Sequence, residues 1–87
     1  MQDEIARLQD EVNLGNKARG AYIGYVKDFI EKVSMELYQE FVIASDDGQS
    51  LLVKRKHTAL MDLETSILRD IETGSLATKQ LEILGKQ

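Results

Sequence analysis

Apolar residues recur every three or four positions along most of the chain, which is the pattern of amphipathic helices. The clearest series, with steps of three or four residues, consists of Ile23, Val26, Ile30, Val33, Leu37 and Phe41. It predicts a long helix over residues 17–44, with an apolar face as wide as that of a core helix. A second series, from Val53 through Leu60 to Ile71, predicts another long helix over residues 50–72.

Shorter segments flank these two helices. Ile5, Leu8 and Val12 are spaced as in a coiled coil and predict a helix over residues 1–14. Leucines near the other end predict a short last helix over residues 75–84. Isolated helices below about 12–15 residues are marginally stable in water. The first segment therefore requires a partner, either within this chain or from a second copy.

Two glycines mark expected helix ends. Gly costs about 1 kcal/mol in a helix interior relative to Ala, so Leu-Gly-Asn at residues 14–16 predicts a break or kink. A continuous helix through Gly15 is the alternative, because Val12 and Ile23 are eleven residues apart, close to three helical turns. Thr-Gly-Ser at residues 73–75 predicts the end of the third helix, because Gly is favoured just after a helix C-terminus.

The clearest turn lies at residues 45–50, where Asp, Gly and Ser cluster, and Asp47 or Ser50 is the expected cap of the next helix. Residues 40–56 also fit a β-hairpin, because strand-like apolar runs flank an Asp-Asp-Gly turn. Neither run alternates apolar with polar residues, and a lone hairpin is marginal in water. The absence of Pro at all 87 positions further favours helices. We therefore predict an all-α fold, an antiparallel helical hairpin with short N- and C-terminal helices in a single domain, 1–87.

In a single copy of such a hairpin, about half of each apolar face would remain exposed to solvent. Apolar burial contributes about 25 cal/mol per Å², and ordering the chain costs about 1.5 kcal/mol per residue, so the two nearly cancel at this size. We expect a homodimer or a higher helical oligomer. Gly20 and Gly24, four residues apart, give weak support for a close helix–helix contact. The expected core or interface positions are Ile5, Leu8, Val12, Ile23, Val26, Ile30, Val33, Leu37, Phe41, Leu60, Ile67 and Ile71.

Composition excludes several function classes. The chain has no Cys and one His, which removes disulfides, zinc-thiolate sites, Cys nucleophiles and most histidine–metal chemistry. No catalytic or nucleotide-binding motif is present, so we expect neither an enzyme nor a cofactor or metal. No apolar run approaches the roughly 20 residues of a membrane span, and the charged start at residues 1–4 is unlike a signal peptide. We therefore expect a cytoplasmic protein with no membrane partner.

The net charge is −4, yet the basic residues form two groups. One group is Lys17 with Arg19, close to Tyr22, and the other is Lys54, Arg55 and Lys56. Cations of this kind attract phosphate, and a tyrosine ring can stack on a base, so these six residues are the candidate anion or ligand site.

The structural alternative is a solvated helix face whose cations pair with Glu36 and Glu40 across the hairpin. Three successive helical residues point about 100° apart and cannot all face one ligand. His57, the one imidazole, lies on or beside the apolar series. We expect it to pack against a neighbour such as Tyr38 or a carboxylate rather than to act as a catalytic base.

These observations favour a small acidic, oligomeric helical protein that acts by binding a partner protein. Its composition is like that of accessory proteins of phages and mobile elements, including inhibitors and assembly factors. The first alternative is an oligomer that sequesters an anionic small molecule or nucleotide in basic pockets between subunits. The second is a small DNA-packaging or replication factor, although a pI of about 4.9 argues against binding to duplex nucleic acid.

Overall fold

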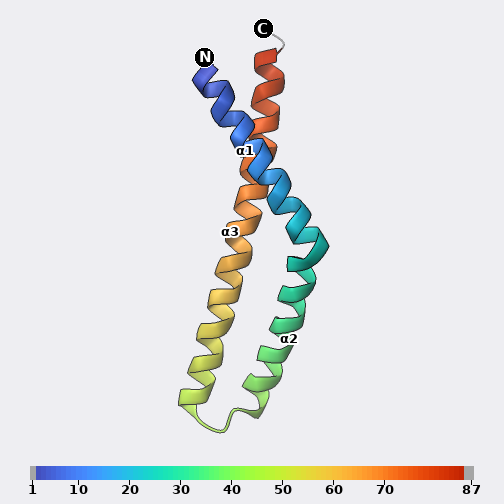
Figure 1. Cartoon of the computed structure of the whole chain (residues 1–87). Coiled ribbons are helices and arrows are strands. Elements are labelled where there is room, and N and C mark those ends of the chain that lie inside the picture. The colour runs from blue at the N-terminus through green and yellow to red at the C-terminus, as the bar shows by residue number, and fades with distance from the viewer. Residues whose placement is uncertain (1, 86–87) are drawn as a thin grey trace.

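The computed structural model describes residues 2–85, which form one long bent helical rod folded back on a second rod (Figure 1). Helix α1 spans Gln2–Ala21, the π-helical segment η1 spans Tyr22–Val26, and α2 spans Lys27–Ile43. Residues 44–46 connect α2 to α3, which spans Asp47–Gly85. The all-α hairpin is confirmed, and no strand forms at residues 40–56. Residue 1, where the first expected helix begins, lies outside the described residues.

Helices α1 and α3 cross at two glycines. A Cβ atom added to Gly15 would lie 2.8 Å from the Cα atom of Gly74, and one added to Gly74 would lie 2.8 Å from the Cα atom of Gly15. Only a hydrogen atom fits at either position. Helix α1 is therefore continuous through residues 14–16, where a break was expected, and α3 is continuous through residues 73–75, where a helix end was expected. Both glycines allow the two helices to pack closely.

Beyond the crossing, the N-terminal half of α1 packs on the C-terminal part of α3 of its own chain. Leu8 is fully buried there, Ala77 is almost so, and Ile5, Val12 and Leu81 are half-buried. The first segment thus finds its partner within the chain. Both termini lie at the same end of the hairpin, where the two helices diverge (Figure 1).

On the other side of the crossing, α2 and α3 share the main hydrophobic core. Ile30 and Leu37 of α2 pack with Val53 and Leu60 of α3, and all four are buried. The partly buried side chains of Val26, Val33 and Met61 pack against this cluster. Of the other predicted core positions, Ile67 and Ile71 are half-buried on α3.

Two predicted core positions, Ile23 and Phe41, are 68% and 42% exposed. Ile23 is turned outward by η1. Tyr22 follows Gly15 by seven residues, which is close to two α-helical turns, so both face the same side. Ile30 follows Tyr22 by eight residues and still faces that side, because the wider π turn of η1 accommodates the one additional residue. Tyr22 and not Ile23 therefore faces α3. Phe41 lies near the end of α2, close to the connecting residues 44–46, and beside Lys54 at the edge of α3.

The start of α3 is capped from the connecting residues. The Asp46 Oδ1 atom accepts a hydrogen bond from the Gln49 backbone N–H at 2.7 Å. The Gln49 Oε1 atom accepts hydrogen bonds from the Ser45 backbone N–H at 3.0 Å and from its hydroxyl at 3.1 Å. The cap is thus Asp46 and not Asp47 or Ser50, both of which lie inside the helix. An acidic cap followed by Gln three residues later resembles a capping box, a signal that is readable in the sequence.

Replacing Asp46 with Ala should destabilise the protein by about 1 kcal/mol, because the Gln49 N–H then loses its acceptor. Asp47→Ala is the matched control, since it removes the same charge one position later, where only the helix dipole, worth a few tenths of a kcal/mol, is affected. Urea unfolding followed by circular dichroism measures both. Equal losses in the two variants would contradict the assignment of the cap.

The hairpin is elongated rather than globular, with extents of 63 × 22 × 14 Å. Its radius of gyration is 18.5 Å, compared with about 12 Å for a compact chain of this length. Its accessible surface is 6653 Å², compared with about 5,200 Å² for a compact protein of the same mass. The chain therefore exposes more surface than a folded monomer of this size usually does.

Candidate functional site

The main concave surface runs along one face of α2 and α3. Near the connecting residues 44–46 it has a volume of about 450 Å³ and is lined by Ser34, Leu37, Tyr38, Phe41, Val53, Lys54, His57 and Thr58. Toward η1 it continues over Ile30, Glu31, Met35, Met61 and Glu64 and shares Ser34 and Tyr38 with the first part. We call this continuous surface the α2–α3 groove.

The α2–α3 groove has an apolar floor and an apolar rim. Ile30, Leu37 and Val53 form the buried floor. Met35 and Tyr38 stand on the rim and are 59% and 64% exposed. Apolar side chains of this size at the edge of a groove are typical of a surface that another chain covers.

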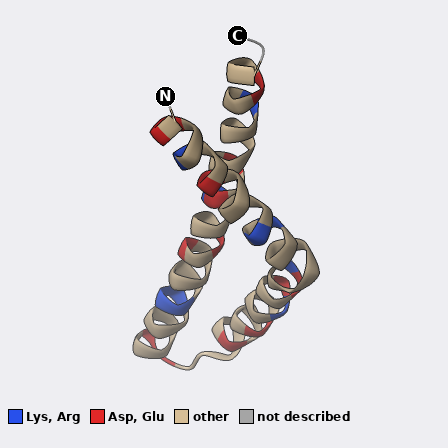
Figure 2. Ribbon diagram, turned by 45° about the horizontal axis from the view of Figure 1, so that its top comes forward, with Lys and Arg blue, Asp and Glu red and all other residues tan. Residues whose placement is uncertain are grey.

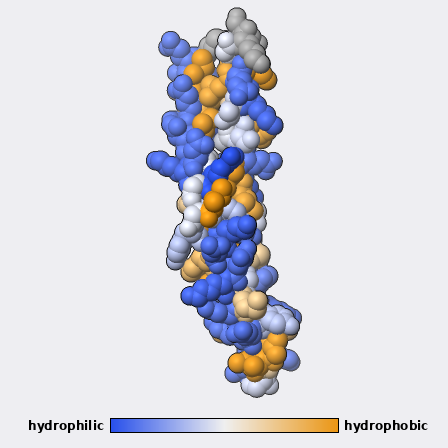
Figure 3. All heavy atoms as spheres, turned by 90° about the vertical axis from the view of Figure 1, so that its right-hand side faces the viewer, coloured by the Kyte–Doolittle hydropathy of each residue, from blue (hydrophilic) through white to orange (hydrophobic). Residues whose placement is uncertain are grey.

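Further large apolar side chains are exposed elsewhere along the rod. They are Leu14, Tyr25, Phe29, Val42, Ile43, Leu51, Leu52, Leu63, Leu68, Leu76 and Ile83. On the face drawn in Figure 3, hydrophobic atoms gather toward both ends of the molecule between polar side chains. Tyr25 and Phe29 stack on each other, with 5.8 Å between ring centroids. One face of the Tyr25 ring is therefore already in contact with the Phe29 ring of α2.

Opposite charges lie at the two ends of the groove. Lys54 lines the end near residues 44–46, and its Nζ atom lies 5.7 Å from the centroid of the Phe41 ring. Glu31 and Glu64 line the end near η1. Glu31 precedes Phe41 by ten residues, so the charged ends lie about 15 Å apart along the helix axis.

The three basic residues that start α3 do not converge on one point. Lys54 lies over Phe41, whereas the Lys56 Nζ atom lies 3.9 Å from the Glu40 Oε2 atom of α2. Arg55 is exposed and is not among the residues that line the groove. The solvated helix face describes this group better than a shared anion site, and an exposed ion pair such as Lys56–Glu40 contributes at most about 1 kcal/mol.

The second basic group lies far from the first. Lys17 and Arg19 are exposed on α1, close to the crossing. Arg19 precedes Phe41 by 22 residues, which corresponds to about 33 Å of helix. One copy of the chain therefore does not bring the six candidate residues together. Charged positions of both signs are spread along the rod (Figure 2).

A polar cleft lies beside the crossing glycines. It has a volume of about 390 Å³ and is lined by Gly15, Asn16, Arg19, Ile71, Gly74, Ser75, Thr78, Lys79 and Glu82. The sequence interpretation included Arg19 but missed Lys79 and the two hydroxyl residues. Only the contact between the two glycines, which are distant in sequence, places these side chains around one cleft.

Tyr22 anchors η1 to α3. Its hydroxyl donates a hydrogen bond to the Glu64 Oε2 atom at 3.1 Å. Partial burial raises the pKa of Tyr22 above its ordinary value of 10.0, and the hydrogen bond to Glu64 and the negative charges of Glu64 and Glu31 raise it further. The Tyr22 hydroxyl thus contacts α3 of its own chain, and ligand binding by Tyr22 stays a prediction.

Tyr22 should ionise above its ordinary pKa of 10.0. Because its pKa is higher in the folded than in the unfolded chain, its contribution to stability is present below the unfolded pKa and is lost as pH rises through the folded pKa. Absorbance of tyrosinate during alkaline titration measures this, and Tyr22→Phe should remove ionisation above the ordinary tyrosine pKa, with Tyr25→Phe as the control. Loss of this ionisation in Tyr25→Phe alone would contradict the role of the Glu64 contact.

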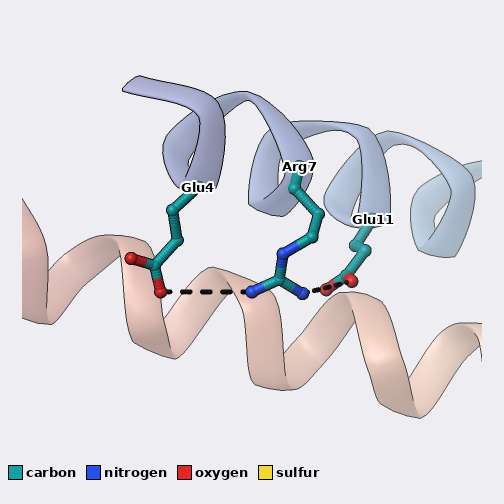
Figure 4. A network of polar contacts seen from close by, with 3 residues as sticks. All are labelled: Glu4, Arg7 and Glu11. Atoms are coloured by element: carbon teal, nitrogen blue, oxygen red, sulfur yellow. Dashed lines mark hydrogen bonds and ion pairs between the residues drawn. The ribbon is translucent and has the colours of Figure 1, made fainter. Parts of the chain in front are cut away.

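The remaining polar candidates are His57 and the charged side chains near the start of α1. His57 is exposed and lines the groove together with Tyr38, one of the neighbours expected for it. Near the N-terminus, Arg7 of α1 lies between Glu4 and Glu11, at 4.0 Å and 2.9 Å (Figure 4). Such pairs on a helix surface contribute a few tenths of a kcal/mol. Within residues 2–85, no group of three His, Asp or Glu side chains is placed to hold a metal ion.

Comparisons with known proteins gave no assignment: no protein-family model, curated protein or solved structure matched the chain. Among the described helices, none has the length and apolar character that crossing a bilayer requires. The functional interpretation therefore depends on the surface geometry described above.

Proposed function

We propose that this chain is a small helical interaction protein that acts by associating with other protein chains, including copies of itself. The observation that carries the proposal is the accessible surface, which exceeds that of a compact protein of this mass by about 1,500 Å². Much of the exposed surface is apolar, and large unpartnered apolar surfaces mark interaction sites.

The distribution of polar groups supports the same function. In the part of the chain that the structure describes, no polar or charged side chain is buried. Catalytic and specific ligand sites usually position a few polar groups in a largely enclosed pocket. Here the α2–α3 groove is open and mainly apolar, which suits a protein segment better than a small substrate.

Light scattering and small-angle X-ray scattering over a wide range of protein concentration test the proposal. We expect the molar mass and the melting temperature to rise with concentration, because association stabilises the folded chain by mass action. At the lowest concentration the radius of gyration should remain near that of the elongated hairpin. A compact monomer at every concentration, with a radius of gyration near 12 Å, would overturn the proposal.

The polar cleft favours anion binding as a second candidate function. Arg19 and Lys79 lie with Asn16, Ser75 and Thr78 around a volume that could hold a phosphate group. Glu82 reduces the positive charge of the cleft. Arginine and lysine are the usual partners of phosphate oxygens, and hydroxyl and amide groups supply further donors.

Calorimetry with inorganic phosphate and with mononucleotides and dinucleotides tests this second candidate. Arg19→Glu and Lys79→Glu should each abolish the heat of binding, whereas Arg55→Glu, outside the cleft, should leave it unchanged. An absence of heat with every anion, or equal loss in the Arg55 variant, would exclude the cleft as the site.

A further inference from the structure

We propose that the α2–α3 groove is covered by the same groove of a second copy, packed antiparallel and face to face, so that two hairpins form a four-helix bundle. This inference rests on the proposed function and deepens it by naming one partner and the face that this partner covers.

The first argument is the incomplete packing of the hairpin. Helices bury their apolar faces by packing in layers, and two antiparallel helices supply only one layer. The floor of the groove is already buried, but Met35 and Tyr38 on its rim are largely exposed. Both lie between Glu31 and Phe41, near the middle of the groove on α2. A two-fold axis at this point would bring them against their equivalents in the second copy, as isologous contacts require.

The second argument is charge complementarity. The groove is acidic at Glu31 and Glu64 and basic at Lys54. A two-fold axis that runs across the groove inverts the second copy, so Lys54 of each copy lies at the level of the two glutamates of the other. The parallel alternative would place like charges together, which is unfavourable. The charge pattern therefore selects the antiparallel arrangement.

The third argument is the available area. Each partner in a standard protein–protein interface contributes about 800 Å². The surplus of about 1,500 Å² over a compact protein is sufficient for one such interface. Two stacked hairpins would also have a more even cross-section, because the second hairpin adds a layer along the thinnest dimension of the rod, which is 14 Å.

A charge exchange on the full-length chain tests the inference. Lys54→Glu places a carboxylate opposite Glu31 and Glu64 at both symmetric ends, and we expect it to weaken the dimer on the order of tenfold or more. Combining Lys54→Glu with Glu31→Lys restores opposite charges at each end and should recover much of the affinity. Sedimentation equilibrium gives the dissociation constants, and circular dichroism verifies that each variant stays helical.

Arg55→Glu is the matched control, because it makes the same charge change at the next position, outside the groove. It should leave the dissociation constant nearly unchanged. If the protein associates but Lys54→Glu and Arg55→Glu behave alike, or if the charge exchange gives no recovery, the inferred face is wrong and the broader interaction function stands. A wild-type chain that remains an elongated monomer would also overturn this dimer.

Discussion

Replacing Leu8 with Ala should lower the free energy of unfolding by about 2–5 kcal/mol, the largest effect that we expect from one side chain in α1. Leu8 is fully buried against the C-terminal part of α3, and truncation would leave a cavity beside Ala77. For a chain with a small core, such a loss is a large fraction of the total stability. Urea unfolding followed by circular dichroism measures it.

Leu14→Ala is the matched control for this prediction. It makes the same chemical change in the same helix, but Leu14 is 53% exposed. It should change the stability by less than about 1 kcal/mol. Similar losses in the two variants, or no loss in Leu8→Ala, would show that the first helix does not dock on α3 in solution as described.

Gly74→Ala should destabilise the protein by about 1–2 kcal/mol, although Ala is the better helix former by about 1 kcal/mol. The added Cβ atom would lie 2.8 Å from the Gly15 Cα atom and 3.0 Å from the Glu11 carbonyl oxygen. Both atoms belong to the backbone, so they can move only if α1 and α3 separate. The steric cost therefore exceeds the gain in helix propensity.

The same substitution at Gly20 should have the opposite sign. Apart from its chain neighbours and the local helix backbone, a Cβ atom at Gly20 meets no atom within 4 Å, so Gly20→Ala should stabilise α1 by up to about 1 kcal/mol. The melting temperatures of the two variants, compared with the wild type at one protein concentration, test both predictions. A gain in stability at Gly74 would contradict the close crossing of the two helices.

Local periodicity was sufficient to predict the helices and much of the core. Leu8, Ile30, Leu37 and Leu60 were expected to be buried and are buried, because side chains three, four or seven residues apart share one helix face whatever the partner is. The connection between α2 and α3 was also placed correctly. Its capping residue was expected at Asp47 or Ser50 and is Asp46, although the spacing of Asp46 and Gln49 was visible.

The glycines were the main failure, and the reason is physical. Gly near a helix end and Gly at a helix crossing look alike in one sequence, because the difference lies in what stands opposite. The packing role of Gly15 can be recognised only when Gly74, which is distant in sequence, is known to lie opposite it. Gly20 and Gly24, which were singled out for close contact between copies, make no such contact with another helix of the same chain, so this expectation stays a prediction.

The candidate site was predictable only in part for the same reason. Lys54 and Phe41 could be named from sequence, but their contact depends on the register of α2 against α3. The rim residues Met35 and Tyr38 became relevant only after the inner face of α2 was known. Side chains that act through a surface formed by two helices carry little signal within either helix.

The segment η1 has a consequence for how related sequences can vary in length. Because its π turn absorbs one residue more than a regular helix needs, a homologue with a single deletion within residues 22–26 would have an uninterrupted α-helix with the same sides still facing α3. A deletion elsewhere in α1 or α2 would instead rotate Leu8 or Leu37 by about 100° away from α3. Natural gaps of one residue in this rod are therefore expected to concentrate at η1.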